Sequence, residues 1–355
     1  MLTIYGHLDS ISGVARHASG FAHAISRHLD VAWVPLDPTR LPTSEPWRQW
    51  LEKGRADLST TIGLGIGAPD VMTRIRGRRR IGWVVWETSR MPESRLRHLR
   101  DLDEIWTPTA WGRQILIDSG LRTIPIRVVP EGVDSDLFRP IPQDGTGDRP
   151  FRFLCVGKWE RRKGFDLLLR AWARAFTPDD PVELILHTYD ERNSGWSLDA
   201  ALDELGLGAH APVHWSRPTR LLSLVLLYNR SDVFVSATRG EGWGLPIFEA
   251  LACAKPVIAP AFGALDELLD DQVADRIETD SRPAAYGWDT SDDEDVGFWG
   301  EPSVDHLVEL LRRAFEHPER GTALGQRGRA AVLERWTWDR AAEIALAELS
   351  RDNHH

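Results

Sequence analysis

Short apolar runs and longer amphipathic stretches alternate along the first half of the chain. The apolar runs show little polar alternation, which is typical of strands buried on both faces of a parallel sheet. They predict strands over residues 2–5, 31–35, 60–66, 81–86, 104–107 and 126–129. Apolar residues at helical spacing predict helices over 14–29, 93–102 and 111–119. This order of elements is typical of an α/β domain.

The second half of the chain repeats the scheme. Strands are predicted over residues 151–157, 182–189, 211–216, 232–238 and 255–260, and helices over 164–176, 198–205, 220–228 and 246–252. The segment IPQDGTGDRP, residues 141–150, is rich in Pro, Gly and Asp and is the natural linker between the halves. We therefore expect an α/β protein of two doubly wound Rossmann-like domains that face each other across a cleft. Ligands bind such sheets at the carboxyl ends of the strands.

The linker sets the expected domain boundaries, at residues 1–145 and 146–336. Three helical patterns close the chain, over 304–316, 320–336 and 340–349. We expect residues 337–355 to form a C-terminal helix that packs back toward the first domain. Residues 274–299 include the acidic run DTSDDEDVG and lack a clear period, so we expect a loop insertion, either a solvated surface or a lid.

The stretch GEGWGLPIFEALACAKPVIAP, residues 240–260, begins at a Gly-rich turn after a predicted strand. Pro246 suits the first turn of the helix that follows, because its missing N–H costs nothing there. The amides of Gly244 and Leu245 then point out of a helix N-terminus, which attracts anions. The turn is therefore a candidate phosphate site.

Two carboxylates flank this candidate phosphate site. Glu241 lies on the turn, and Glu249 lies about one turn into the helix. Such a pair suits a ligand with a phosphate in the middle and hydroxyl-bearing sugars at both ends, as in a nucleotide-sugar. On this segment alone the alternative stays open that Glu241 is a turn residue and Glu249 a helix-dipole partner.

A second segment, LCVGKWERRKGFDLLLRAW, residues 154–172, places two lysines around the next candidate turn. Lys158 leaves the strand and Lys163 opens the helix. A cation at a helix N-terminus opposes the macrodipole unless an anion lies between them, so the pair predicts a pyrophosphate site. Arg161 and Arg162 are either solvated flanks, which is the favoured interpretation, or further contacts for the pyrophosphate.

Composition and charge narrow the class of protein. The 355 residues exceed the size at which a single core stops growing, which favours two domains. No apolar run approaches the roughly 18 residues of a membrane span. The start has no signal-peptide pattern, and the two cysteines, Cys155 and Cys253, lie in apolar segments, so we expect a cytoplasmic protein.

The charge is unevenly distributed along the chain. Residues 1–148 hold 19 Lys and Arg against 18 Asp and Glu, whereas residues 149–355 hold 24 Lys and Arg against 35 Asp and Glu. The acidic second half argues against non-specific nucleic-acid binding.

Together these segments resemble the family-4 retaining glycosyltransferases of the GT-B fold. Glu241 and Glu249 match the family's E-x7-E motif, and VGKWERRKG matches its loop with two cations, with Lys158 where Arg is commoner. IRVVPEGVDSDLFRP resembles the segment that closes the first domain, and ISGVARH resembles the N-terminal Gly-containing loop. VVWETSRMPES and DEIWTPTAWGRQIL resemble a subgroup with a Trp-Glu pair after the fourth strand. The ordered set of five segments spans nearly the whole chain and is the specific signal.

The resemblance implies a role for each matched residue. Lys158 and Lys163 would neutralise the donor diphosphate, and Glu249 would accept hydrogen bonds from the ribose hydroxyls. Glu241 would contact the transferred sugar and support positive charge at its anomeric carbon. The implied donor-binding residues are Gly13, Gly157, Lys158, Lys163, Glu241, Gly242, Trp243, Gly244, Leu245, Pro246 and Glu249, of which Lys158, Lys163 and Glu241 are catalytic.

Three residues of the first domain are further candidates. Gly13 would let the backbone approach the diphosphate, unless it is an ordinary turn glycine. Glu87 and His17 are candidate acceptor-side residues. For Glu87 the alternative is a pair with Arg90, and for His17 it is a satisfied core or surface position.

An arginine run and the tryptophans carry less specific signals. RIRGRRR, residues 74–80, is either a solvated loop before a strand or a contact for an anionic acceptor or a lipid surface at the inner face of the membrane. Most of the sixteen tryptophans are expected in the core. Four lie next to predicted cleft loops, where they would stack on sugar rings: Trp86, Trp111, Trp243 and Trp299.

Neither a cofactor nor a metal is implied. Asp101-x-Asp103 and Asp134-x-Asp136 imitate the metal motif of the other glycosyltransferase fold, but their positions favour structural roles. A double displacement would need a nucleophilic carboxylate and a second carboxylate near the bond, and no clear pair is present. The resemblance implies reaction on one face of the sugar, with the leaving phosphate accepting the proton of the acceptor.

The sequence thus predicts a retaining, metal-independent glycosyltransferase of glycan biosynthesis. Its donor would be a nucleotide-sugar, with UDP- or GDP-sugars favoured, and its acceptor a glycan, a lipid-linked sugar or a small molecule. Two alternatives share the fold. A nucleotide-sugar 2-epimerase would need a general acid and base beside the anomeric centre, and a non-catalytic partner subunit would be expected to have lost Glu241, Lys158 or Lys163.

Overall fold

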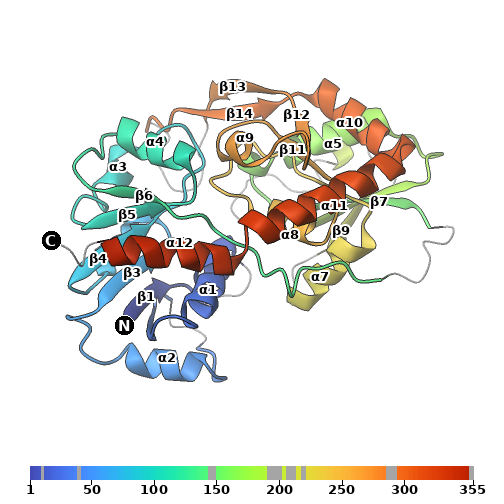
Figure 1. Ribbon diagram of the computed structural model, residues 1–355. Coiled ribbons are helices and arrows are strands. Elements are labelled where there is room, and N and C mark those ends of the chain that lie inside the picture. The colour runs from blue at the N-terminus through green and yellow to red at the C-terminus, as the bar shows by residue number, and fades with distance from the viewer. Residues whose placement is uncertain are drawn as a thin grey trace. The chain divides into compact units, whose positions relative to one another are not determined.

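The computed structural model describes residues 1–8, 12–37, 41–142, 149–189, 202–204, 213–216, 221–284 and 294–351. The chain forms two compact units (Figure 1). Unit 1 consists of Met1–Asp134, Glu294–Gly297 and Trp336–His355, and unit 2 of Ser135–Asp293 and Phe298–Arg335. The change from unit 1 to unit 2 thus falls earlier than the predicted boundary after residue 145, and residues 143–148 of the predicted linker lie outside the described residues.

Unit 1 is built on a six-stranded parallel sheet with the order β2-β1-β3-β4-β5-β6. Its strands are β1 (Leu2–Gly6), β2 (Val31–Pro35), β3 (Ile62–Ile66), β4 (Arg79–Trp83), β5 (Glu104–Thr107) and β6 (Ile126–Val128). Its helices are α1 (Gly13–Ile25), α2 (Trp47–Lys53), the 3-10 helix η1 (Pro69–Arg74), α3 (Glu93–Leu96), α4 (Ala110–Asp118) and α12 (Trp338–Ser350). Because β2 and β3 lie on opposite sides of β1, the strand order reverses beside β1, which marks a ligand position in such sheets.

Unit 2 has a second six-stranded parallel sheet, with the order β12-β11-β10-β7-β8-β9. Its strands are β7 (Phe151–Lys158), β8 (Val182–Tyr189), β9 (Val213–Ser216), β10 (Val233–Val235), β11 (Val257–Pro260) and β12 (Asp275–Ile277), and β13 (Thr279–Pro283) pairs antiparallel with β14 (Phe298–Pro302). Its helices are η2 (Arg161–Lys163), α5 (Phe165–Ala175), α7 (Leu221–Arg230), α8 (Leu245–Ala252), α9 (Ala264–Leu268), α10 (Val304–Glu316) and α11 (Pro318–Arg335). Here the order reverses between β7 and β10.

Local sequence explains where several helices begin. Ser12, Thr109, Ser303 and Thr337 each precede a helix, and each side-chain oxygen accepts a hydrogen bond from a backbone N–H of the first turn. These bonds satisfy amides that have no partner within the helix. The helices then cover the sheets with apolar faces, and large aromatic side chains fill the two cores.

Most predicted elements are present within a few residues of the predicted bounds, but three expectations were wrong. The helix predicted over 93–102 ends at Leu96. Residues 274–299 are not simply a loop insertion, because they contain β12, β13 and the start of β14. The arginine run is not only a loop, since η1 ends at Arg74 and β4 begins at Arg79. Residues 198–201 and 205 of another predicted helix lie outside the described residues.

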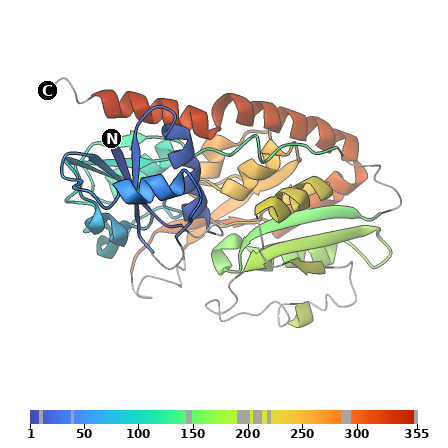
Figure 2. The ribbon, with the colours of Figure 1, turned by 90° about the horizontal axis from the view of Figure 1, so that it is seen from below.

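The last helix, α12, belongs to unit 1. Its N-terminal end lies against α1 in both views (Figures 1 and 2). The indole of Trp338 lies over Gly20, where an added Cβ would meet the ring Nε1 at 2.3 Å. A glycine is therefore needed at this point of α1 for α12 to pack this closely.

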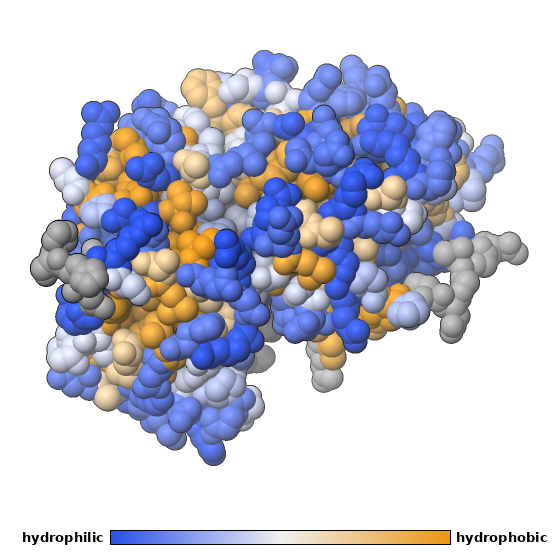
Figure 3. All heavy atoms as spheres, viewed as in Figure 1, coloured by the Kyte–Doolittle hydropathy of each residue, from blue (hydrophilic) through white to orange (hydrophobic). Residues whose placement is uncertain are grey.

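Hydrophilic side chains are spread among apolar ones over the face that Figure 3 shows. Within the described parts of the chain, no helix combines the length and the hydropathy that a membrane span requires.

Candidate functional site

Two loops of unit 2 meet where the strand order reverses. One follows β7 and contains η2, and the other follows β10 and leads into α8. The backbone N–H of Arg239 donates to the carbonyl of Arg162 at 2.6 Å, and the Thr238 hydroxyl donates to the same carbonyl at 3.2 Å. The loops that carry the predicted lysines and glutamates are thus bonded to each other.

Gly164 allows this close approach. Its φ is +67°, and an added Cβ would lie 1.8 Å from the carbonyl oxygen of Ala237. A side chain at position 164 would therefore be strained and would also clash with the second loop.

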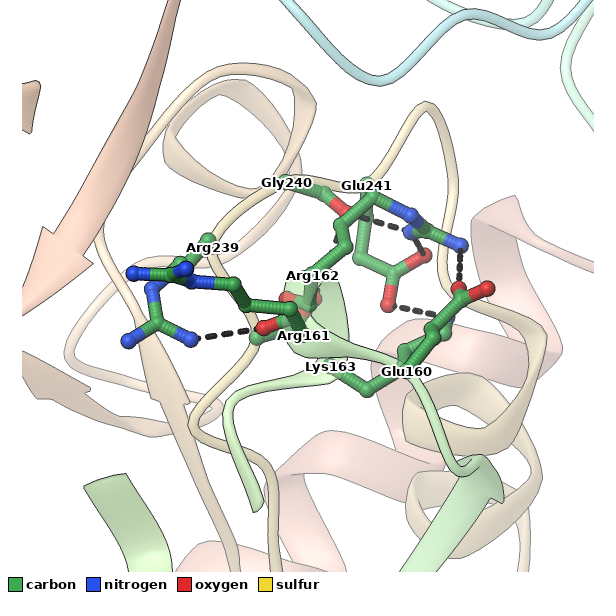
Figure 4. A network of polar contacts seen from close by, with 8 residues as sticks. Glu160, Arg161, Arg162, Lys163, Arg239, Gly240 and Glu241 are labelled. Atoms are coloured by element: carbon green, nitrogen blue, oxygen red, sulfur yellow. Dashed lines mark hydrogen bonds and ion pairs between the residues drawn. The ribbon is translucent and has the colours of Figure 1, made fainter. Parts of the chain in front are cut away.

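The Glu241 carboxylate is held between two cations (Figure 4). Lys163 Nζ donates to Glu241 Oε1 at 2.6 Å, and Arg162 Nη1 donates to Oε2 at 3.3 Å. The carboxylate is almost completely buried, with Glu241 only 8% exposed. Burial alone would raise the pKa of Glu241, but Lys163 and Arg162 outweigh it and hold this pKa below its usual value. Glu241 is therefore ionised at neutral pH.

The first turn of α8 lies directly after Glu241. Gly242 and Trp243 complete the turn, and Gly244 precedes the helix with φ +99° and ψ 54°. Leu245 and Pro246 form the first turn of α8, as the sequence predicts. Free backbone N–H groups at such a helix start favour an anion.

The tryptophans expected at sugar-stacking positions are mostly core residues instead. Trp243 is 1% exposed and stacks on Phe248, with ring centroids 4.7 Å apart. Trp86 and Trp299 are also buried, and only Trp111 is half-buried. Stacking on sugars by Trp86, Trp243 and Trp299 is therefore a wrong expectation, because their ring faces pack inside the protein.

Glu249 lies on the inner side of α8. It is 2% exposed, and the Tyr228 hydroxyl of α7 donates to Glu249 Oε2 at 2.9 Å. Neither Tyr228 nor this bond was predicted. A lone tyrosine in an apolar helix gives no signal that its hydroxyl meets a carboxylate on another helix.

Lys158 and Gly157 end β7, next to Lys163. Lys158 is half-buried and pairs in register with Tyr189 of β8. An added Cβ at Gly157 would meet Lys163 Cγ and Cδ at 3.5 Å, so the stem of Lys163 lies over the end of β7. The two predicted cations and Glu241 therefore belong to one region of unit 2.

Arg239 is a buried residue of this region that the sequence did not indicate. Its guanidinium donates to both oxygens of Asp166 at 2.8 Å and to both oxygens of Glu301, at 2.6 and 3.0 Å. Burial lowers the pKa of an arginine, but these carboxylates outweigh burial and raise it. Arg239 thus stays charged and ties the second loop to α5 and β14. It stands between a strand and a glycine in the sequence, where an exposed turn residue is the simpler interpretation.

Gly13 and Glu87 lie in unit 1 near the ends of its strands. Gly13 is the first residue of α1, which follows β1, and Glu87 is half-buried in the segment after β4. Arg90 forms an ion pair with Asp295, with Nη1 and Oδ2 2.6 Å apart.

Of the two interpretations of His17, the structure confirms the core position and not the acceptor-facing one. It is 2% exposed, in T-shaped contact with Trp83 and stacked on Trp338. Glu131 Oε1 is 3.6 Å from His17 Nδ1, which favours protonation, but complete burial outweighs it and lowers the pKa of His17 to about 3. His17 is therefore a neutral core residue of unit 1.

The arginine run is built into unit 1. Arg74 and Arg76 donate to backbone carbonyls, Arg79 forms an ion pair with Glu104, and Arg80 with Asp103. Arg78 is exposed. Four of the five arginines therefore have structural bonds within their own unit.

Asp103 also accepts a hydrogen bond from the backbone N–H of Arg80, at 2.7 Å, which gives it a structural role. Within the ranges that the structure describes, no three His, Cys, Asp or Glu side chains are grouped as metal ligands.

Comparison with known proteins identifies the domain that carries this site. Residues 150–287 match the family model described as "Glycosyl transferases group 1". The chain is 28% identical over 347 residues to the GDP-mannose-dependent alpha-(1-6)-phosphatidylinositol monomannoside mannosyltransferase of Mycolicibacterium smegmatis, covering 88% of this chain and 82% of the relative. It is 30% identical over 258 residues to the MMP alpha-(1->4)-mannosyltransferase of Mycolicibacterium hassiacum, a match that covers 72% of this chain and 56% of the relative. It is 33% identical over 187 residues to the D-inositol 3-phosphate glycosyltransferase of Geodermatophilus obscurus, a match that covers 49% of this chain and 41% of the relative. In the last two cases the match spans less than two thirds of the relative.

Solved structures support the same fold. The sucrose-phosphate synthase of Thermosynechococcus elongatus matches with a TM-score of 0.71 at 18% identity, covering 99% of this chain and 98% of the other. Anabaena Alr3699/HepE in complex with UDP and glucose matches with a TM-score of 0.72 at 14% identity, covering 99% of both chains. The two parallel-sheet units and these neighbours establish the GT-B fold. The group 1 match over residues 150–287 and the transferase relatives point to a glycosyltransferase, and the subgroup with the Trp-Glu pair stays a prediction.

Proposed function

We propose that this chain, which carries a group 1 glycosyltransferase domain on a GT-B fold, transfers a sugar from a nucleotide-sugar to an acceptor with retention of anomeric configuration. One observation carries the proposal. The Lys163 amine, the ionised Glu241 carboxylate and the first turn of α8 are placed together where the strand order of unit 2 reverses. A sugar diphosphate offers a partner to each of them.

The donor diphosphate would bind between the lysines and the start of α8. Lys158 and Lys163 neutralise its charge, and the amides of Gly244 and Leu245 bind its distal phosphate or the sugar. Gly157, Gly242, Trp243 and Pro246 shape the backbone around these contacts. Two matches that cover most of the chain favour a GDP- or UDP-sugar, because one relative is GDP-mannose-dependent and one neighbour was solved with UDP.

Glu249 would accept hydrogen bonds from the ribose hydroxyls of the donor. Tyr228 holds one carboxylate oxygen at 2.9 Å and so fixes the orientation of the group. Because Glu249 is 2% exposed here, this role requires the carboxylate to become accessible when the donor binds.

The chemistry we propose needs no metal and no covalent intermediate. Glu241 is ionised and supports the positive charge that builds at the anomeric carbon as the bond to the diphosphate breaks. The lysines stabilise the departing diphosphate, whose oxygen takes the proton of the acceptor hydroxyl on the same face of the sugar.

Two residues of unit 1 stay predictions of the family resemblance, Gly13 for the donor and Glu87 for the acceptor. The acceptor would be a glycan, a lipid-linked sugar or a small molecule. The run at residues 74–80 offers three exposed arginines to an anionic acceptor or a membrane surface: Arg74, Arg76 and Arg78.

Thermal unfolding with UDP-, GDP-, ADP- and dTDP-sugars tests the proposal, because a ligand that binds only the folded state raises the melting temperature. We expect one of these donors to raise it and to be turned over when candidate acceptors are added. No stabilisation by any of the four would contradict the proposal.

The two alternative functions are not favoured. The relatives found are named as transferases, and Glu241, Lys158 and Lys163 are all present. An assay for sugar isomerisation without acceptor separates a 2-epimerase from a transferase.

A further inference from the structure

Arg162 is bonded into the contact between the two loops of unit 2, although its sequence position suggested a solvated flank. Its side chain is 10% exposed. Nη1 donates to the carbonyl of Gly240 at 2.6 Å, and Nη2 donates to Glu160 Oε1 at 2.6 Å. Figure 4 shows this guanidinium between Glu160 and the Gly240–Glu241 turn, whereas Arg161 enters the network through its backbone carbonyl.

Glu241 therefore has a separate cation on each oxygen. Lys163 binds Oε1 and Arg162 binds Oε2. A buried carboxylate that loses its counter-ion suffers a large desolvation penalty, so at least one of the two cations has to remain.

The charged groups of Lys163 and Arg162 differ in mobility. The Lys163 ammonium ends a flexible four-carbon stem and can turn toward a new anion. The Arg162 guanidinium is planar, and its other bonds to Gly240 and Glu160 fix its plane. A diphosphate that attracts Lys163 weakens the bond between Lys163 and Glu241 but leaves Arg162 in place.

We propose that Arg162 is a positioning residue that keeps Glu241 paired and the Gly240 peptide fixed while Lys163 turns from Glu241 to the donor diphosphate. This inference rests on the proposed function, since it takes the diphosphate to be the anion that Lys163 meets. It assigns Arg162 an effect on donor binding that acts through Glu241 and not through contact with the ligand.

A double-mutant cycle with isothermal calorimetry tests this inference, with UDP, GDP, ADP and dTDP as probes. In Arg162→Met, binding would leave Glu241 without a cation, so we expect the nucleotide that binds the wild type to bind about 10- to 100-fold more weakly. In a Glu241→Gln background residue 241 is neutral, so the loss of both cations leaves no unpaired buried charge. Adding Arg162→Met there should change affinity by less than about threefold.

Arg161→Met is the matched control. Arg161 has an exposed side chain, and its carbonyl is kept in the variant, so nucleotide affinity should stay at the wild-type value. If Arg162→Met does not fold, Arg162→Lys keeps one charge but cannot reach Gly240 and Glu160 together, and it should show a smaller loss that Glu241→Gln again removes.

Three results would overturn the inference. Equal losses from Arg162→Met in the wild-type and Glu241→Gln backgrounds would show that Arg162 contacts the diphosphate or only supports the fold. Unchanged affinity in Arg162→Met would show that Lys163 stays paired with Glu241 when the nucleotide binds. If the wild type binds none of the four nucleotides, the proposed function itself fails and this inference fails with it.

Discussion

Glu241 and His17 are both buried, yet Glu241 is ionised and His17 is neutral. Glu241 keeps its charge because Lys163 and Arg162 lie on its two oxygens and lower its pKa. His17 is enclosed by Trp83 and Trp338, and its burial lowers its pKa to about 3. At the scale of the residue, the neighbours decide whether a buried group is ionised.

His17 should make the protein sensitive to acid. The unfolded chain binds a proton near the ordinary pKa of 6.5, whereas the folded state does so only near 3. The free energy of unfolding therefore falls as the pH drops below about 6.5, by about 2 kcal/mol between about pH 7.5 and about pH 5 from this group. Urea unfolding at both pH values should show a smaller drop for His17→Gln than for the wild type. Equal drops would contradict the burial of a neutral His17.

Lys163→Ala should weaken the binding of both a nucleoside diphosphate and inorganic pyrophosphate, by about 10- to 100-fold, because it removes a cation from the diphosphate site. Calorimetry measures both ligands. Lys53→Ala is the control, because Lys53 pairs with Asp30 in unit 1 and should leave both affinities unchanged. If Lys163→Ala binds pyrophosphate with wild-type affinity, the diphosphate does not bind at Lys163.

Glu249→Gln should separate ribose binding from phosphate binding. The glutamine can still accept the Tyr228 hydroxyl but is a weaker acceptor for ribose hydroxyls. We expect weaker binding of the nucleoside diphosphate, by about tenfold, and no change for pyrophosphate, which has no ribose. A parallel loss for the two ligands would refute the ribose role.

At the scale of the element, the sequence predicted the helices and strands whose limits depend on the local spacing of apolar residues, Pro and Gly. The helix predicted over 246–252 is α8, Leu245–Ala252, because Pro246 and the apolar run after it specify a helix start. β13, TDSRP, escaped prediction because it is polar and largely exposed, so it has no hydrophobic period. The candidate site divides in the same way. Lys163 and Glu241 carry a motif, whereas Arg239 and Tyr228 act through partners far away in the sequence.

Gly164→Ala tests the contact between the two loops. The alanine would adopt a positive φ and place its Cβ against the Ala237 carbonyl. We expect a loss of about 2–5 kcal/mol in the free energy of unfolding and weaker nucleotide binding. Chemical denaturation and calorimetry measure the two effects.

Gly120→Ala is the matched comparison. Its φ is +116° and nothing lies within 4 Å of an added Cβ, so it carries only the backbone strain, about 1–3 kcal/mol. Gly120 lies in unit 1, so nucleotide affinity should be unchanged. Equal nucleotide affinity in the two variants would contradict a functional contact between the loops.

At the scale of the whole molecule, the boundary between the units follows contacts and not composition. The sequence suggested a change after residue 145, inside a stretch rich in Pro, Gly and Asp. The structure assigns residues from Ser135 to unit 2, where the Asn229 side chain bonds the carbonyl of Arg139 and the N–H of Ile141. Such long-range bonds leave no local pattern.

Everything proposed for unit 2 requires the loops after β7 and β10 to hold a donor diphosphate. A crystal structure of the protein soaked with UDP or GDP tests this. We predict the β-phosphate within hydrogen-bonding distance of Lys163 Nζ and of the amides at the start of α8, with Arg162 still on Glu241. Phosphates bound away from both loops, with Lys163 still on Glu241, would contradict the account.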